Sequence, residues 1–193
     1  MIILVGKSGS GKTSIAKELE ERYGIKKVVT CTTRPMRPGE VQDKDYHFMT
    51  EEEFVSRMDN GEFAETAEYN ASFGHCFYGS LKKDYEDNSD KKLIILNPYG
   101  LREVREKHIP GVSIYLGVDD AELRYRLTAR GDSPEEIERR LAADNKDFSD
   151  ISTDASIFIR HGINIEEVTD MVADTLSILG VNLEEERDSY ENE

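Results

Sequence analysis

A glycine-rich stretch near the start of the chain has the residue types and the spacing to bind phosphate. Gly6 is followed, after four residues, by Gly11, Lys12 and Thr13, which is the spacing of a P-loop. In such a loop the glycines let backbone N–H groups converge on an anion, the lysine reaches the outer phosphates of a nucleotide, and the threonine hydroxyl faces Mg²⁺. The stretch therefore predicts a binding site for nucleotide phosphates.

The residues on either side of this loop favour the same interpretation. Residues 2–5 are an apolar run typical of a buried parallel strand, and residues 13–23 continue as a helix with Ile15, Ala16 and Leu19 on one face. The N-terminus of that helix points at the same anion. A glycine-rich turn without a ligand has no need of this strand, spacing, lysine and threonine together. GTPases, ATPases, nucleotide kinases and small-molecule kinases all use such a loop, so it names no reaction.

A second candidate phosphate site follows within the next twenty residues. Arg34 and Arg37 lie three residues apart in residues 32–40, a segment whose prolines prevent a regular helix. Two guanidinium groups on a stiff loop suit a phosphate, because each offers a planar fork of N–H donors. A solvated basic loop remains an alternative for this segment taken by itself.

The composition excludes several classes of function. The chain has 193 residues, enough for one sizeable core with a small inserted subdomain, and a formal net charge of −15. Such an acidic body argues against a nucleic-acid partner. A signal-peptide pattern and an apolar run of about 18 residues are both absent, so we expect a cytoplasmic protein with no membrane partner. Cys31 and Cys76 lack metal-site spacing and are expected to be free thiols.

Strand-like and helix-like segments alternate along the chain. This alternation predicts an α/β fold of the P-loop kinase type, with a parallel sheet that has helices on both faces. Two strand-like runs that read as a hairpin indicate a small mixed-β subdomain inserted between the strands of that sheet. Besides the segments at 2–5 and 13–23, we expect strands at 28–31, 45–49, 62–69, 73–78, 91–96, 112–118 and 156–159, and helices at 51–58, 98–107, 119–129, 133–148 and 165–179.

Taken in order, these motifs resemble the guanylate kinase family over roughly residues 1–179. The pieces that carry the resemblance are the P-loop, Thr32-Thr33-Arg34 with Arg37, Gly39-Glu40, Asp45-Tyr46-His47-Phe48, Glu62-Phe63-Ala64-Glu65, Tyr78-Gly79-Ser80, and Arg130-Gly131 followed by Glu135 to Leu141. The resemblance implies transfer of the ATP γ-phosphoryl group to GMP or dGMP, giving ADP and GDP, with Mg²⁺ accompanying ATP. It also implies one domain at 1–183, with a core at 1–31 and 81–179, a GMP-binding subdomain at 32–80, a lid at about 130–148 and an acidic tail at 184–193.

The resemblance also assigns site residues. Glu65 would accept from the guanine N1–H and 2-amino groups, and the Ser80 hydroxyl would meet O6. The residues implied for GMP are Thr30, Arg34, Arg37, Tyr46, Glu65, Tyr78 and Ser80. Those implied for ATP are Gly6, Ser8, Gly9, Ser10, Gly11, Lys12, Thr13 and Ser14, with Thr13 as the metal ligand. Those implied for catalysis are Lys12, Arg34, Arg126, Arg130 and Arg140.

The sequence departs from the family pattern in two places. Asn97 alone stands where the family has an Asp-x-Asp stretch, and residues 70–77 read as a hairpin loop several residues longer than usual. Three alternatives stay open: a GTPase or ATPase, a kinase of another small phosphorylated acceptor, and a guanylate-kinase-like binding module without catalysis. A hydrolase would want an Asp at the end of the strand at 91–96, whereas a module has no need of an intact P-loop. No oligomeric state is predicted.

Overall fold

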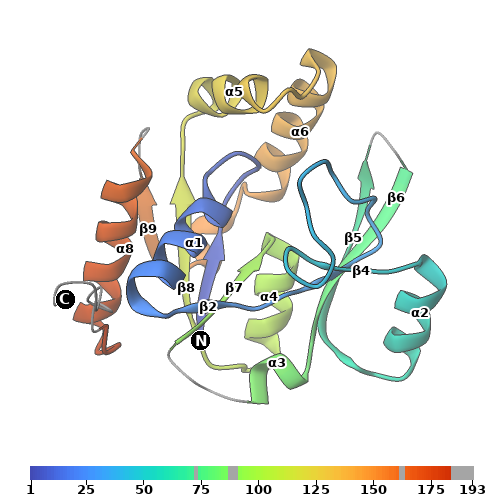
Figure 1. Cartoon of the computed structure of the whole chain (residues 1–193), viewed down its shortest axis with the longest axis horizontal. Helices are drawn as coiled ribbons and strands as arrows, with labels where there is room; N and C mark the ends of the chain where they lie inside the picture. Colours follow the sequence, from blue (N-terminus) through green and yellow to red (C-terminus); the bar gives the residue numbers. More distant parts are fainter. Residues whose placement is uncertain (72–73, 87–90, 161–163, 184–193) are drawn as a thin grey trace, which may run out of the picture.

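The apolar run near the N-terminus forms the middle strand of a five-stranded parallel sheet (Figure 1). The computed structural model describes residues 1–71, 74–86, 91–160 and 164–183. The sheet has the order β2-β7-β1-β8-β9, in which Ile2 pairs with both Leu93 and Val112. Its strands are β2 (Lys26–Lys27), β7 (Lys92–Leu96), β1 (Ile2–Val5), β8 (Val112–Gly117) and β9 (Ile157–Arg160).

Helices cover both faces of this sheet, as the alternating pattern predicts. On one face, α1 (Lys12–Tyr23) and α8 (Ile165–Ile178) pack over Ile2 and Leu4. On the other face, α4 (Pro98–Glu106) and α7 (Ile151–Asp154) pack over Ile3 and Val5. All four residues of β1 are buried, because side chains on both faces of a doubly covered sheet are removed from water.

A second sheet of four strands stands beside the first (Figure 1). Its order is β4-β3-β6-β5, with β4 at His47–Phe48, β3 at Cys31–Thr32, β6 at Gly74–Leu81 and β5 at Phe63–Ala71. Helix α2 (Glu51–Asp59) packs on it through Phe54 and begins with a capping box of Thr50 and Glu53. The short helix α3 (Lys83–Glu86) follows β6 directly.

Two further helices stand above the carboxyl end of the parallel sheet (Figure 1). Helices α5 (Asp120–Ala129) and α6 (Pro134–Asp147) share a small apolar cluster with Val118. The Ser133 hydroxyl accepts from the Glu136 N–H and so begins α6 where the sequence predicts. In the part of the chain that the structure describes, the Asp119 side chain makes no equivalent bond at the start of α5.

The structure corrects two local predictions. The strand expected at 28–31 is wrong: its last residue, Cys31, pairs with Gly79 in the second sheet, while the Val28 N–H still bonds to Leu93 O of the first. The chain crosses between sheets here. The loop expected at 70–77 is largely strand, since Asn70 and Ala71 pair with residues of β6. The short helices α3 and α7 were not predicted from the sequence.

The acidic tail, the absence of a membrane-spanning helix and the two cysteines were also predicted from the sequence. The acidic tail at 184–193 lies outside the described residues. Among the helices that the structure describes, none is both long enough and apolar enough to cross a bilayer. Cys31 and Cys76 are buried free thiols, as expected.

Candidate active site

A cavity of about 210 Å³ lies where the P-loop, the second sheet and α6 meet. It brings together ten of the residues that the sequence implicates. These are Gly6, Ser8, Lys12, Thr30, Arg34, Arg37, Tyr46, Glu65, Tyr78 and Arg140. It is also lined by Tyr69, Cys76, Gly79, Ile95, Leu96, Asn97, Arg139, Ala143, Asp144, Asp147 and Phe148, none of which the sequence marks as a ligand-binding residue.

The P-loop is folded around its own lysine. Gly9 and Gly11 have φ angles of 82° and 91°, which side chains other than glycine rarely adopt. The Lys12 ammonium donates to Gly6 O at 2.6 Å and to Lys7 O at 3.0 Å. Burial lowers the pKa of Lys12 to about 8, Asp144 opposes this and Arg130 adds to it. An anion in the loop would raise the pKa of Lys12 again, because it stabilises the charged ammonium. The charged lysine in turn favours the binding of phosphate.

Helix α6 reaches down onto the P-loop. The Ser8 N–H donates to Asp144 Oδ2 at 2.6 Å. The Lys7 ammonium donates to Asp120 Oδ1 at 2.9 Å and also contacts Asn145 on α6. Two carboxylates and an amide therefore join the loop to α5 and α6. The sequence gives no signal for these contacts, because their partners lie more than a hundred residues from the loop.

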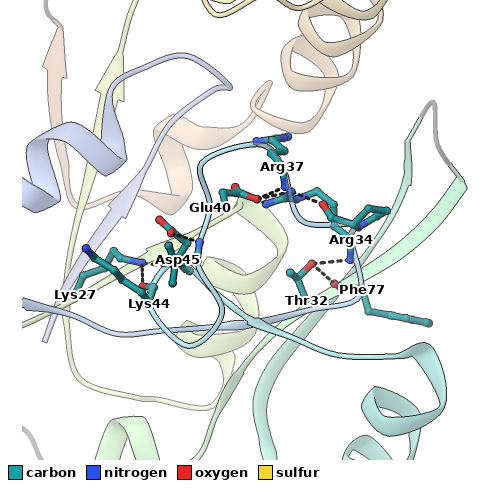
Figure 2. Close-up of polar contacts among 10 residues, drawn as sticks. Lys27, Thr32, Arg34, Arg37, Glu40, Lys44, Asp45 and Phe77 are labelled. Atoms are coloured by element: carbon teal, nitrogen blue, oxygen red, sulfur yellow. Dashed lines mark hydrogen bonds and ion pairs between the residues drawn. The ribbon is translucent and has the colours of Figure 1, made fainter.

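Arg34 is held by a carboxylate six residues further on (Figure 2). Its guanidinium donates to Glu40 Oε1 at 2.8 Å and to Glu40 Oε2 at 2.9 Å, and its side chain is only 3% exposed. The Arg37 N–H donates to the same carboxylate at 2.7 Å. Glu40 thus positions both arginines. The sequence analysis assigns Glu40 no such role, although an acidic residue inside a basic, proline-rich loop is a signal for an ion pair with a neighbouring arginine.

The Arg37 guanidinium faces the cavity from this loop. Burial lowers its pKa, and the positive charges of Arg34, Arg140 and Arg130 lower it further. The repulsion among these guanidinium groups is unfavourable in the empty cavity. An anion bound between them would relieve it, because a nearby negative charge favours the ionised form of an arginine. The arrangement is that of an anion site.

Aromatic side chains form the wall beside these arginines. The rings of Tyr46 and Tyr78 meet edge to face with centroids 6.0 Å apart, and Tyr69 meets Tyr78 at 5.7 Å. The Arg34 guanidinium lies over the Tyr46 ring, 5.3 Å from its centroid. Burial raises the pKa of both Tyr46 and Tyr78, so their hydroxyls stay protonated and can donate to an anion.

A buried carboxylate forms another part of the cavity wall. Glu65 is 3% exposed and accepts from the Ser80 hydroxyl at 2.8 Å. Burial raises the pKa of Glu65 to about 7, and the Ser80 hydrogen bond opposes that rise. A Cβ atom at Gly100 would stand 2.6 Å from Glu65 Oε2, so any side chain there would displace this carboxylate. A carboxylate this dry suits a ligand that brings hydrogen-bond donors of its own.

The structure leaves the other sequence-implicated residues outside this cavity. Arg126 pairs with Glu122 at 2.8 Å and contacts Gly9 O, and Arg130 pairs with Asp132. Thr13 and Ser14 are exposed at the start of α1. Gly9, Ser10, Gly11 and Ser80 are not among the residues that line it. Asn97 does line the cavity, but its side-chain oxygen accepts from the Gly100 N–H at 2.8 Å and so caps α4.

Comparison with known proteins decides the family. The model of the guanylate kinase family matches residues 1–177. This chain belongs to the guanylate kinase family. Its P-loop, paired arginines and buried carboxylate are thus parts of one phosphotransferase fold, and the chain is a nucleotide-binding kinase.

Individual members of the family align with this chain over most of their own length. The guanylate kinase of Thermotoga maritima is 36% identical over 177 residues, which cover 89% of this chain and 83% of that protein. That of Anaplasma phagocytophilum is 36% identical over 186 residues, covering 91% and 85%. The crystal structure of guanylate kinase from Anaplasma phagocytophilum superposes with a TM-score of 0.72 at 33% identity, covering 94% of this chain and 87% of that one.

Proposed function

We propose that this chain transfers the γ-phosphoryl group of ATP to GMP, producing ADP and GDP. One observation carries the proposal beyond family membership: a single cavity is lined by the P-loop lysine Lys12, the anion-binding Arg37 and the buried carboxylate Glu65. These three groups match the donor phosphates, the acceptor phosphate and the acceptor base of one reaction.

The acceptor base is read by Glu65 and Ser80 in this proposal. Guanine presents two adjacent donors, N1–H and the 2-amino group, which one carboxylate can accept together, and the Ser80 hydroxyl donates to O6. Adenine lacks this pair of donors, so AMP would leave Glu65 buried and unpaired. Thr30, on the cavity wall, completes the base pocket.

The acceptor phosphate is held by Arg37 and Arg34, with the hydroxyls of Tyr46 and Tyr78. The depressed pKa of Arg37 supports this role, because a phosphate dianion would relieve the repulsion among the guanidinium groups around it. Arg34 keeps Glu40 as its partner and turns its remaining N–H groups to the phosphate.

Phosphoryl transfer then needs charge stabilisation more than proton transfer. Lys12, Arg34 and Arg140 lie on the cavity, and Arg126 and Arg130 stand at the P-loop side from α5 and the loop after it. The acceptor is already an anion, so no general base is required. ATP lies on the loop from Gly6 to Ser14.

The residues at the loop fit a Mg²⁺ ion that is carried mainly by the nucleotide. Thr13 offers one exposed hydroxyl, while the Asn97 oxygen is engaged as a helix cap. Within the described residues, no cluster of three acidic, histidine or cysteine side chains could enclose a metal. Mg²⁺ commonly keeps phosphate and water ligands, and when bound it neutralises developing charge on the β- and γ-phosphates.

The proposal extends to the organisation and setting of the chain. Residues 32–80 act as the GMP-binding subdomain and about 130–148 as the lid, on a core at 1–31 and 81–179. GMP and dGMP are both acceptors, and the enzyme works in the cytoplasm on free nucleotides rather than nucleic acid.

An ADP-release assay over GMP, dGMP, AMP, CMP and UMP tests the function. We expect GMP and dGMP to be used and the other three to be poor acceptors, with one GDP formed per ADP. Free phosphate without GDP would indicate a hydrolase. A different preferred acceptor would replace the guanine assignment, and ligand binding without turnover would indicate a non-catalytic module.

A further inference from the structure

A tyrosine outside the cavity lining completes the hydrogen bonding of the base pocket. The Tyr85 hydroxyl lies 2.8 Å from Ser80 Oγ, which in turn lies 2.8 Å from Glu65 Oε1. All three residues are buried, with exposed fractions of 9%, 0% and 3% for Tyr85, Ser80 and Glu65. Breaking one of these hydrogen bonds is costly, because it leaves a buried polar group without a partner and out of reach of water.

Counting hydrogens gives this chain of bonds a direction. A serine hydroxyl carries one hydrogen, and when Glu65 is ionised the Ser80 hydrogen is directed at that carboxylate. The hydrogen in the bond between Ser80 and Tyr85 must then come from the phenol. Burial raises the pKa of Tyr85, and the carboxylates of Glu65, Asp84 and Glu103 also raise it while the Ser80 bond lowers it. The phenol therefore keeps its proton and donates to Ser80 while Glu65 is ionised.

The backbone holds the Tyr85 ring in place from the opposite side. Asp84 Oδ2 accepts from the Leu81 N–H at 3.1 Å, and Lys82 O accepts from the Tyr85 N–H at 3.0 Å. This tight turn after β6 sends the ring into the apolar cluster that contains Leu96 and Leu101 of the parallel-sheet core. The phenol thus anchors the Ser80 oxygen of the second sheet to the core of the first.

We propose that Tyr85 is a positioning residue for the acceptor base. It donates to Ser80 whether the Ser80 hydrogen points at Glu65 in the free enzyme or at the base O6 in the complex. The Ser80 oxygen keeps Tyr85 as a partner throughout, so its hydrogen can turn from Glu65 to the base while the bond from the phenol remains. The hydrogen bond from Tyr85 also occupies one lone pair of the Ser80 oxygen. This favours Ser80 as a donor to the base, which suits a purine with a carbonyl oxygen at position 6. The inference rests on the proposed function.

The test compares wild-type enzyme with Tyr85→Phe, which removes only the hydroxyl. We expect the KM for GMP to rise about fivefold to tenfold, with the KM for ATP and kcat within about twofold of wild type. Tyr23→Phe is the matched control, because Tyr23 is also buried, at 7% exposed, but lies at the far end of α1 from the P-loop. It should leave both KM values unchanged.

Two further readouts separate positioning from simple packing. Without the phenol, Ser80 donates less strongly to Glu65, so the acid limb of kcat/KM for GMP should move to higher pH in Tyr85→Phe. Glu103 and Lys107 also face Glu65 and are unchanged. In a Ser80→Ala background, Tyr85→Phe should cause no further rise in the KM for GMP, because it acts through Ser80.

Each outcome has a distinct meaning. An unchanged KM for GMP in Tyr85→Phe, an equal rise in both KM values, or full additivity with Ser80→Ala would overturn the role of Tyr85. The guanylate kinase function would survive all three results. A wild-type enzyme that does not phosphorylate GMP would instead overturn the proposed function itself.

Discussion

The carboxylate of Asp144 on α6 accepts a hydrogen bond from the P-loop N–H of Ser8 at 2.6 Å. It places a negative charge among the backbone donors that a P-loop offers to phosphate. Asp144 also lines the same cavity as Lys12 and acts to raise the pKa of that lysine, as a phosphate would. If the P-loop binds ATP as proposed, the nucleotide and this side chain compete for one set of donors.

Removing the carboxylate should strengthen nucleotide binding. Asp144→Ala is expected to lower the ATP Kd by roughly fivefold to tenfold, because a charged hydrogen bond no longer has to be broken. Titration calorimetry measures it. Asp147→Ala is the matched control, since it removes the same charge from the same cavity but its carboxylate accepts from the Tyr99 hydroxyl at 2.9 Å. Weaker ATP binding in Asp144→Ala would show that the carboxylate assists the nucleotide instead.

Lys12 should be indispensable for turnover. Without a nucleotide, its ammonium donates to Gly6 O and Lys7 O of the loop itself. Lys12→Met is expected to reduce kcat at least about a hundredfold, since the transferring group loses its nearest cation. Circular dichroism and the unfolding temperature would report any accompanying change in the loop. Turnover near the wild-type rate would remove the assignment of Lys12 to the phosphates.

Arg37 should act on the acceptor side alone. Arg37→Ala is expected to cost about 2–3 kcal/mol in kcat/KM for GMP, the range for losing one partner of a charged hydrogen bond. The KM for ATP should change little. Arg57→Ala is the control, because Arg57 lies on α2 of the same region with a side chain 45% exposed. If Arg37→Ala raises both KM values equally, Arg37 belongs to the donor site.

Glu65 should link GMP use to pH. Its pKa of about 7 means that the carboxylate gains a proton on mild acidification, and a protonated carboxyl cannot accept both guanine donors. The kcat/KM for GMP is expected to fall below about pH 7. Glu65→Gln should lose about 2–4 kcal/mol in kcat/KM for GMP at saturating ATP, because its amide opposes a guanine donor. Wild-type efficiency in Glu65→Gln would end the guanine assignment while sparing the kinase assignment.

The same substitution should stabilise the ligand-free protein at alkaline pH. The folded-state pKa of Glu65 is raised from 4.5 to about 7, so its contribution to stability is present below pH 4.5 and is lost as pH rises through 7. Glu65→Gln should therefore gain roughly 1–3 kcal/mol of unfolding free energy at pH 8 relative to its difference from wild type at pH 4. Denaturant unfolding at the two pH values measures it. Glu62→Gln, with a side chain 44% exposed, should show no such pH-dependent gain.

Residue spacing alone predicts the features that depend on near neighbours along the chain. The P-loop, the capping box of Thr50 with Glu53 and the Ser133 cap all involve residues within a few positions of each other, so spacing alone specifies their geometry. The alternation of strands and helices likewise predicted the parallel sheet, because parallel strands need crossover helices and such crossovers have one hand. The role of Glu65 came from family resemblance and had no local signal.

Contacts between residues far apart in the sequence become visible only in the folded protein. Asp144 reaches Ser8 across 136 positions, and Tyr85 reaches Glu65 through Ser80 on a neighbouring strand. The segment expected as a strand at 28–31 instead runs from one sheet to the other: the Val28 N–H bonds to Leu93 O in the first, and Cys31 pairs with Gly79 in the second. Burial, which sets the pKa of Glu65, is a property of everything packed around a side chain. Such contacts depend on the packing of whole elements, and no local pattern of residue types encodes them.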